Sequence, residues 1–202
     1  MPTSLGQYKY IRMETKERSG LGRPRSIDRN KVLDAAEAVV ARIGPAGLTI
    51  DAVAKEAGIT KGGVQYCFGT KDGLLKAMLE RWAEGFDAEV ARLAAKQPGP
   101  FAMVRAYVEA NRHIDEKDAS RSAAMLAALI QSPDQLADTR AWYRRYLAAI
   151  DPSSPEGRKA RLAFLASEGI FFLHSFQFVQ MTEAEWQEIF EDIMRLLPDS
   201  PA

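Results

Sequence analysis

Apolar residues recur at the spacing of α-helices along most of the chain, and no segment makes a convincing strand. The first apolar stripe covers residues 27–43 and ends where Gly44 and Pro45 interrupt it. A longer stripe runs from Thr70 to about residue 95 without a break and stops before the Pro-Gly-Pro sequence at 98–100. The pattern predicts an all-α protein in which one long fourth helix joins two parts.

Five more helices are predicted beyond residue 100, about nine in all. Their expected ranges are 101–116, 120–131, 134–150, 155–180 and a last helix that follows Thr182. Ser154 and Pro155 suit the N-cap and first position of one helix. Thr182 and Glu185 have the spacing of a capping box at the start of the last.

Residues 47–75 have the pattern of a helix-turn-helix followed at once by a third helix, an arrangement that binds duplex DNA. Gly58 supplies a turn residue that tolerates positive φ, and Thr60 can cap the second short helix. That helix contains Gly62 and Gly63 side by side, at a cost of about 1 kcal/mol each relative to alanine. Glycines there would let the backbone approach a phosphate, or would permit a close helix crossing.

The residues from 60 to 68, TKGGVQYCF, and from 69 to 75, GTKDGLL, resemble the signature of the TetR family of bacterial transcription regulators. The resemblance covers residues 27–80. It implies an N-terminal DNA-binding domain, a helical regulatory domain, and a dimer whose last two long helices pair across a two-fold axis. It also implies that Thr49 and Lys71 hold the DNA backbone.

The residue types of the second short helix predict how it would meet DNA. Gln65 and Tyr66 would reach into the major groove, and glutamine can pair bidentately with adenine. The helix would be positioned on phosphates by the residues at its start, Thr60, Lys61, Gly62 and Gly63. Arg29 lies near the start of the first helix. Arg23 and Arg25 belong to a basic arm that would enter the minor groove, although a solvated tail explains the part before Gly20 equally well.

Charge is distributed unevenly along the 202 residues although the total is zero. Residues 1–72 hold 12 Lys and Arg against 8 Asp and Glu, whereas residues 73–202 hold 15 against 19. This asymmetry favours a DNA-binding part joined to a neutral or acidic remainder. We expect a flexible arm at 1–26, a DNA-binding domain at 27–73, a ligand-binding and dimerisation domain at 74–197, and a tail at 198–202. Met13 is an alternative translation start.

The eighth predicted helix is apolar around nearly its whole circumference from Leu162 onward, which predicts burial on several sides. We assign one side to a dimer interface and the other to a ligand cavity, and the opposite assignment remains open. The predicted interface, with two residues of the last helix, consists of Leu165, Gly169, Phe172, Phe176, Trp186 and Phe190.

A pocket for a small apolar or aromatic effector is expected between helices of the regulatory half, because aromatic and methionine side chains suit such a ligand. Ordinary core packing is the alternative for each of these residues. The candidates are Met103, Tyr107, Met125, Trp142, Phe171, His174 and Phe178.

Several other functions lack the residues they need. The chain has two histidines and one cysteine, and no phosphate loop, nucleophile elbow or metal-ligand spacing, so we expect no enzyme, cofactor or metal. No long apolar run resembles a signal peptide or membrane span, which favours a soluble cytoplasmic protein. The predicted function is a ligand-responsive regulator, a repressor that binds a palindromic operator as a homodimer. The alternatives are an architectural DNA-binding protein and, further off, a helical small-molecule carrier or enzyme.

Overall fold

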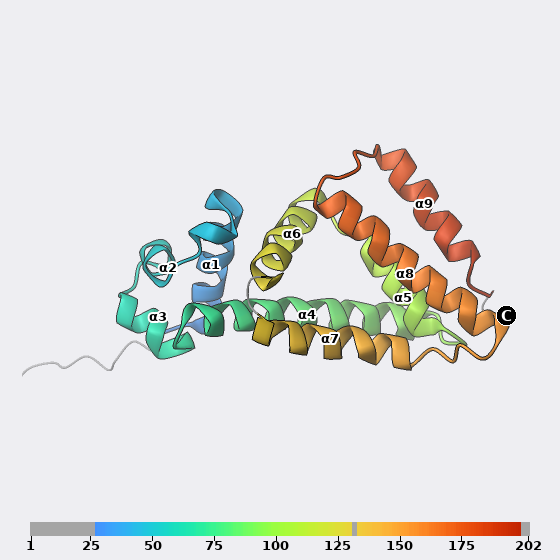
Figure 1. Ribbon diagram of the computed structural model, residues 1–202, viewed down its shortest axis with the longest axis horizontal. Helices are drawn as coiled ribbons and strands as arrows, with labels where there is room; N and C mark the ends of the chain where they lie inside the picture. Colours follow the sequence, from blue (N-terminus) through green and yellow to red (C-terminus); the bar gives the residue numbers. More distant parts are fainter. Residues whose placement is uncertain (1–26, 131–132, 199–202) are drawn as a thin grey trace, which may run out of the picture.

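The computed structural model of the protein describes residues 27–130 and 133–198. Within these ranges the chain forms nine α-helices, a short 3-10 helix and no strand, which confirms the predicted all-α class (Figure 1). The predicted arm with Arg23 and Arg25, together with residues 199–202, lies outside the described residues. The first helices are α1 (Arg29–Ile43), η1 (Pro45–Gly47), α2 (Ile50–Ala57), α3 (Lys61–Phe68) and α4 (Lys71–Lys96). The remaining helices are α5 (Ala102–Arg112), α6 (Glu116–Ile130), α7 (Pro133–Ala148), α8 (Pro155–Ser175) and α9 (Glu183–Arg195).

Short-range hydrogen bonds set where the N-terminal helices begin. Asp28 caps α1 by accepting a hydrogen bond from the backbone N of Asn30 at 3.0 Å. Thr49 caps α2 by accepting one from the backbone N of Ala52 at 3.1 Å. Between α2 and α3, Gly58 adopts φ of 65°, in the left-handed region that favours glycine. These local features place α3 against α2 as the sequence predicts for a helix-turn-helix.

The helix α4 is shared by two hydrophobic cores. Its 26 residues give it a length of about 39 Å at 1.5 Å per residue. Leu74 and Met78 are buried with α1, α2 and α3, whereas Val90 is buried with the C-terminal helices. Figure 1 shows the three N-terminal helices at one end of α4, and α5, α8 and α9 at the other. One rigid element therefore connects the two halves.

The helix α6 contacts both halves of the molecule. It packs against α1 and η1 on one side and against α4, α7 and α8 on others. Met125 on α6 is buried in the same core as Val39 of α1 and Val64 of α3. The DNA-binding core thus includes a side chain from the predicted regulatory domain.

Three helix boundaries differ from the sequence prediction by four residues or more. The helix α5 ends at Arg112 and does not reach residue 116. The helix α6 begins at Glu116, four residues early, because Asp115 Oδ1 accepts a hydrogen bond from the backbone N of Asp118 at 2.8 Å. The helix α8 ends at Ser175 and does not reach residue 180. It ends there because Gln177 takes φ of 55°, a left-handed conformation that stops a helix.

The last helix packs its apolar face inside its own chain. The predicted capping box is present, with Thr182 and Glu185 bonded reciprocally. Trp186 and Phe190 are buried in the C-terminal core, so neither is available to contact a second chain. The prediction that Trp186 and Phe190 belong to the dimer interface is therefore wrong. None of the helices in the described part of the chain combines the length and apolar character that a bilayer crossing requires.

Candidate nucleic-acid interface and effector cavity

One face of α3 is open to solvent and carries the side chains expected to meet DNA. Lys61, Gly62, Gln65 and Tyr66 are all exposed, at the i and i+4 spacing that places them on one side of the helix. The Tyr66 side chain is 88% exposed, an unusual position for a large ring in a monomer. The opposite side of α3, with Val64 and Phe68, packs into the N-terminal core. The core thus presents this face outward on a rigid support.

Threonine hydroxyls stand at the starts of α3 and α4. Thr60 Oγ1 accepts a hydrogen bond from the backbone N of Gly63 at 3.1 Å, and Thr70 Oγ1 accepts one from Gly73 N at the same distance. The exposed hydroxyls of Thr49 and Thr60 each keep a proton that a phosphate oxygen can accept. Lys71 is exposed at the first position of α4. Thr49, Thr60 and Lys71 are thus exposed at the starts of α2, α3 and α4.

The two adjacent glycines of α3 have different environments. A Cβ on Gly62 would meet no atom closer than 3.9 Å, so this position leaves the helix start open. A Cβ on Gly63 would lie 2.9 Å from Ile27 Cδ1, and Gly63 is buried. Gly63 therefore serves the close packing of α3, which was the alternative explanation, and the assignment of Gly63 to phosphate contact is wrong.

Arg29 and Lys61, two basic residues predicted to contact DNA, make contacts within the protein. Arg29 donates a hydrogen bond to the Cys67 carbonyl, and its guanidinium lies 4.5 Å from the ring centroid of Phe68. Arg29 thus joins α1 to the C-terminal end of α3, and because this residue is exposed, its predicted contact with DNA stays a prediction. Lys61 Nζ lies 2.9 Å from Asp51 Oδ2 on α2, in an exposed ion pair that a phosphate can replace.

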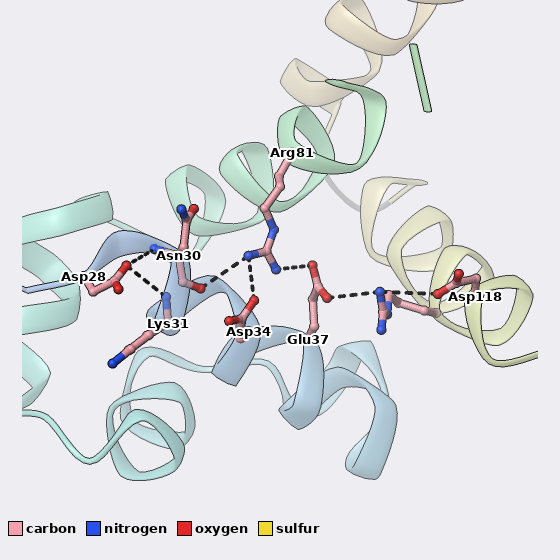
Figure 2. Close-up of polar contacts among 8 residues, drawn as sticks. Asp28, Asn30, Lys31, Asp34, Glu37, Arg81 and Asp118 are labelled. Carbon is pink, nitrogen blue, oxygen red and sulfur yellow. Dashed lines mark hydrogen bonds and ion pairs between the residues drawn. The ribbon is translucent and has the colours of Figure 1, made fainter. Parts of the chain in front are cut away.

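A network of charged side chains joins the N-terminal helices to α4 and α6 (Figure 2). Arg81 on α4 donates to Asp34 Oδ1 at 2.7 Å and also to Glu37, both on α1. The other oxygen of Glu37 lies 3.3 Å from Arg121 Nη1 on α6. Arg121 also pairs with Asp118, 3.4 Å away. Glu37 thus connects α1 to α4 through Arg81 and to α6 through Arg121.

Sequence reasoning did not identify this network. Asp34 and Glu37 occupy the polar side of a predicted amphipathic helix, where charged residues are ordinary. Arg121 is far from both in sequence, and a single sequence contains no signal that pairs it with Glu37.

A cavity of about 170 Å³ lies between α4, α6 and α7. Met125 and Trp142 line it, as predicted for a ligand pocket. The polar atoms of two aromatic wall residues are already bonded: Trp142 Nε1 donates to Asp87 at 3.0 Å, and the Tyr143 hydroxyl donates to Glu168 at 2.6 Å. Much of the wall is therefore apolar. The lining side chains include Leu79, Trp82, Ser122, Met125, Leu126, Leu129, Trp142 and Tyr143.

The other five predicted pocket residues lie elsewhere, so their assignment to one pocket is wrong. Tyr107 and Phe171 are buried in the protein core. The His174 ring lies against that of Trp186, with a centroid distance of 4.6 Å and an interplanar angle of 45°. Phe178 follows α8 and is 76% exposed, and Met103 borders a separate hollow beside the start of α5. The helix α8 itself packs against α5, α6 and α9.

A buried carboxylate, Glu168 on α8, lies behind the cavity wall. It accepts hydrogen bonds from Tyr107 and Tyr143 at 2.6 Å each and from Asn111 at 3.2 Å. Burial raises the pKa of Glu168 above its ordinary value of 4.5, although these hydrogen bonds oppose the shift. The network ties α5, α7 and α8 together beside Tyr143, a wall residue of the cavity.

The raised pKa of Glu168 predicts a pH-dependent stability. The folded protein binds a proton at Glu168 at higher pH than the unfolded chain does, so lowering the pH through the raised pKa stabilises the fold. This gain is complete below the unfolded value near 4.5. Relative to Glu168→Gln, the wild-type free energy of unfolding should increase from mildly alkaline to mildly acidic pH. Denaturant unfolding of both proteins measures this difference, and a pH-independent difference would contradict the prediction.

The helix α8 presents an apolar face to solvent. Leu162, Leu165 and Leu173 are exposed on it, and Gly169 between them has open space where a Cβ would stand. Phe172 and Phe176 are half-buried along its edge. A continuous apolar face of this kind on one chain marks an interaction surface.

The fold and the exposed face of α3 define a helix-turn-helix DNA-binding protein, and comparison with known proteins places it in a family. Residues 32–78 match the model of bacterial regulatory proteins of the tetR family, and residues 101–198 match the tetracyclin repressor-like C-terminal domain. The HTH-type transcriptional regulator BetI of Burkholderia thailandensis is 32% identical over 147 residues, which cover 69% of this chain and 75% of BetI. The chain belongs to the TetR family and is a DNA-binding transcription regulator.

Solved structures agree with this assignment. A transcriptional regulator from Rhodococcus sp. Rha1 is similar with a TM-score of 0.66 and 21% identity, over 85% of this chain and 96% of that chain. The multidrug binding protein EbrR, complexed with imidazole, is similar with a TM-score of 0.64 and 25% identity, over 86% of this chain and 96% of that chain. These likenesses show the same fold, and the family matches favour a regulator over the alternatives of an architectural protein or a small-molecule carrier.

Proposed function

We propose that the protein is a dimeric repressor that binds a palindromic operator and releases it when a small apolar or aromatic molecule enters the cavity between α4, α6 and α7. The position of α6 carries this proposal. Met125 on this helix lines the cavity and is also buried in the core that supports α3. A ligand that displaces α6 would therefore move a side chain on which the DNA-binding helices pack. EbrR, which has a similar structure, is a multidrug binding protein, and this likeness supports a small-molecule effector.

The exposed face of α3 would lie in the major groove. Gln65 and Tyr66 would contact base edges, and Lys61, Thr60 and Gly62 would contact phosphates beside them. Thr49 and Lys71, at the starts of α2 and α4, would hold the backbone on either side. The exposure of this face and the position of Thr49 and Thr60 as exposed N-caps of α2 and α3 support the proposal.

The exposed apolar face of α8 would form the dimer interface. Leu165, Gly169, Phe172 and Phe176, which the sequence predicts for this role, lie along it with Leu162 and Leu173. A two-fold dimer pairs the same face of both chains and would place two α3 helices about 34 to 36 Å apart, or a multiple of this, in successive major grooves.

Protection of the DNA upstream of the protein's own gene tests the proposal directly. The purified protein should protect a two-fold symmetric site at physiological salt and should leave scrambled DNA unprotected. Weak binding that depends strongly on salt and ignores sequence would instead indicate an architectural protein.

Substituting Gln65 and Lys71 separates base reading from backbone contact. Gln65→Ala should reduce the ratio of affinities for the operator and for an operator with altered base pairs by about 5- to 30-fold, because a bidentate contact to a base is removed. Lys71→Ala should weaken all sequences alike and reduce the salt slope of binding by about one unit. Titrations of operator and scrambled DNA at several salt concentrations measure both effects. Equal losses on the two DNAs for Gln65→Ala would refute the base-reading role.

A further inference from the structure

A hydroxyl group without a partner stands in the wall of the cavity. Ser122 on α6 lines the cavity and is 2% exposed. Within the described part of the chain, its Oγ atom has no hydrogen-bond partner. Buried hydroxyls are normally bonded, since burial without a partner costs free energy. Ser122 also lines a more polar hollow beside Arg81 and Arg121, but of the two only the cavity between α4, α6 and α7 has a mainly apolar wall. An unbonded hydroxyl in that wall is suited to form a hydrogen bond with a ligand.

Other polar groups of the wall are already bonded. The indole N–H of Trp142 and the hydroxyl of Tyr143 are bonded to Asp87 and Glu168. Thr139 has an interaction of its own. At the exposed rim, Lys76 pairs with Asp138 and lies 3.2 Å from Glu80, so these three side chains carry a net charge of −1, whereas the wall behind them is formed mainly by apolar side chains. The remaining wall therefore suits a neutral molecule with an apolar body.

The volume of the cavity limits the size of that body. An apolar cavity of about 150 Å³ in another protein holds one benzene molecule, and the cavity here measures about 170 Å³. The rings of Trp82 and Trp142, 6.0 Å apart between centroids, form an aromatic corner of the wall. One ring with a small substituent fits this space and this lining.

We propose that the effector is a neutral molecule of about one aromatic ring with a single hydroxyl or carbonyl group, and that this group forms a hydrogen bond with Ser122 Oγ. The inference rests on the proposed effector site and adds the chemistry that the site selects. Ser122 adjoins Arg121, which is paired with Glu37 of α1. A ligand bonded to Ser122 therefore acts on the helix that connects the cavity to the DNA-binding half.

Phenol and toluene are suitable probes, because they differ chiefly in a hydroxyl group in place of a methyl group. Calorimetric titration should show that the wild-type protein prefers phenol to toluene. Ser122→Ala should reduce this preference about tenfold, because the phenol hydroxyl is then buried without a partner. Ser122→Ala removes an unbonded hydroxyl from a helix, so its thermal midpoint should not fall.

Ser175→Ala is the matched control. Ser175 Oγ is also buried without a partner in the described residues, but it lies on α8 outside this cavity. Its removal should leave the ratio of phenol to toluene affinity unchanged. An unchanged ratio in Ser122→Ala, an equal change in both variants, or a wild-type protein that binds neither probe would overturn the inference. Operator protection, measured on the same samples without probes, tests the regulator function independently.

Discussion

Replacing Leu165 by glutamate is expected to convert the protein into a monomer that no longer protects a symmetric operator. Leu165 is 49% exposed on the apolar face of α8 in a single chain. In a two-fold interface the substitution occurs twice near the axis, and it would bury two carboxylates without partners. Linking two half-site contacts in one dimer raises the affinity for operator DNA by about a hundredfold or more. The monomer should therefore bind the operator at least a hundredfold more weakly than the dimer does.

Sedimentation equilibrium measures the oligomeric state, and titration of operator DNA measures the loss of affinity. Ile130→Glu is the control, because Ile130 is an exposed apolar residue at the end of α6 and lies off this face. The control should remain a dimer with wild-type affinity. A Leu165→Glu protein that remains dimeric and protects both half-sites would show that the dimer uses another surface.

The proposed dimer face illustrates which features a single sequence contains. The apolar stripe of α9 predicts a buried side, but its pattern is the same whether the helix packs on its own chain or on a partner. The structure assigns Trp186 and Phe190 to the core of their own chain. The residues of α8 could be divided into two faces from the sequence, yet the structure was needed to show that Leu165 and Gly169 face outward.

Local features were predicted more completely than distant ones. The caps at Thr60 and Thr182 depend on residues three positions apart, which the sequence displays directly. The cavity depends on helices between residues 76 and 143, and a void between helices leaves no periodic pattern. Met125 and Trp142 were therefore identified by residue type alone, whereas Ser122 was missed.

The second large effect is expected for Glu37→Gln, which should weaken the coupling between α6 and the DNA-binding helices, although Met125 stays packed in their core. Coupling between binding sites is reciprocal, so operator binding at α3 should alter the cavity helices as a ligand alters α3. Glu37 is the residue that joins α1 to Arg81 of α4 and to Arg121 of α6 (Figure 2). The Glu37 side chain is largely buried, so its ion pairs are less screened than those at the surface.

This coupling can be measured with no effector present. The measurement compares hydrogen exchange of the α6 amides in the free protein and in the protein bound to operator DNA. Operator binding should slow exchange in the wild-type protein, and Glu37→Gln should reduce that protection about tenfold, within the usual range of coupling energies. Asp34→Asn removes another carboxylate partner of Arg81 on the same helix, but Asp34 has no ion pair with Arg121 among the described contacts. Its α6 protection should therefore stay at the wild-type level. If both variants lose protection equally, the α1–α4 contact carries the coupling, and Arg121 has no part in it.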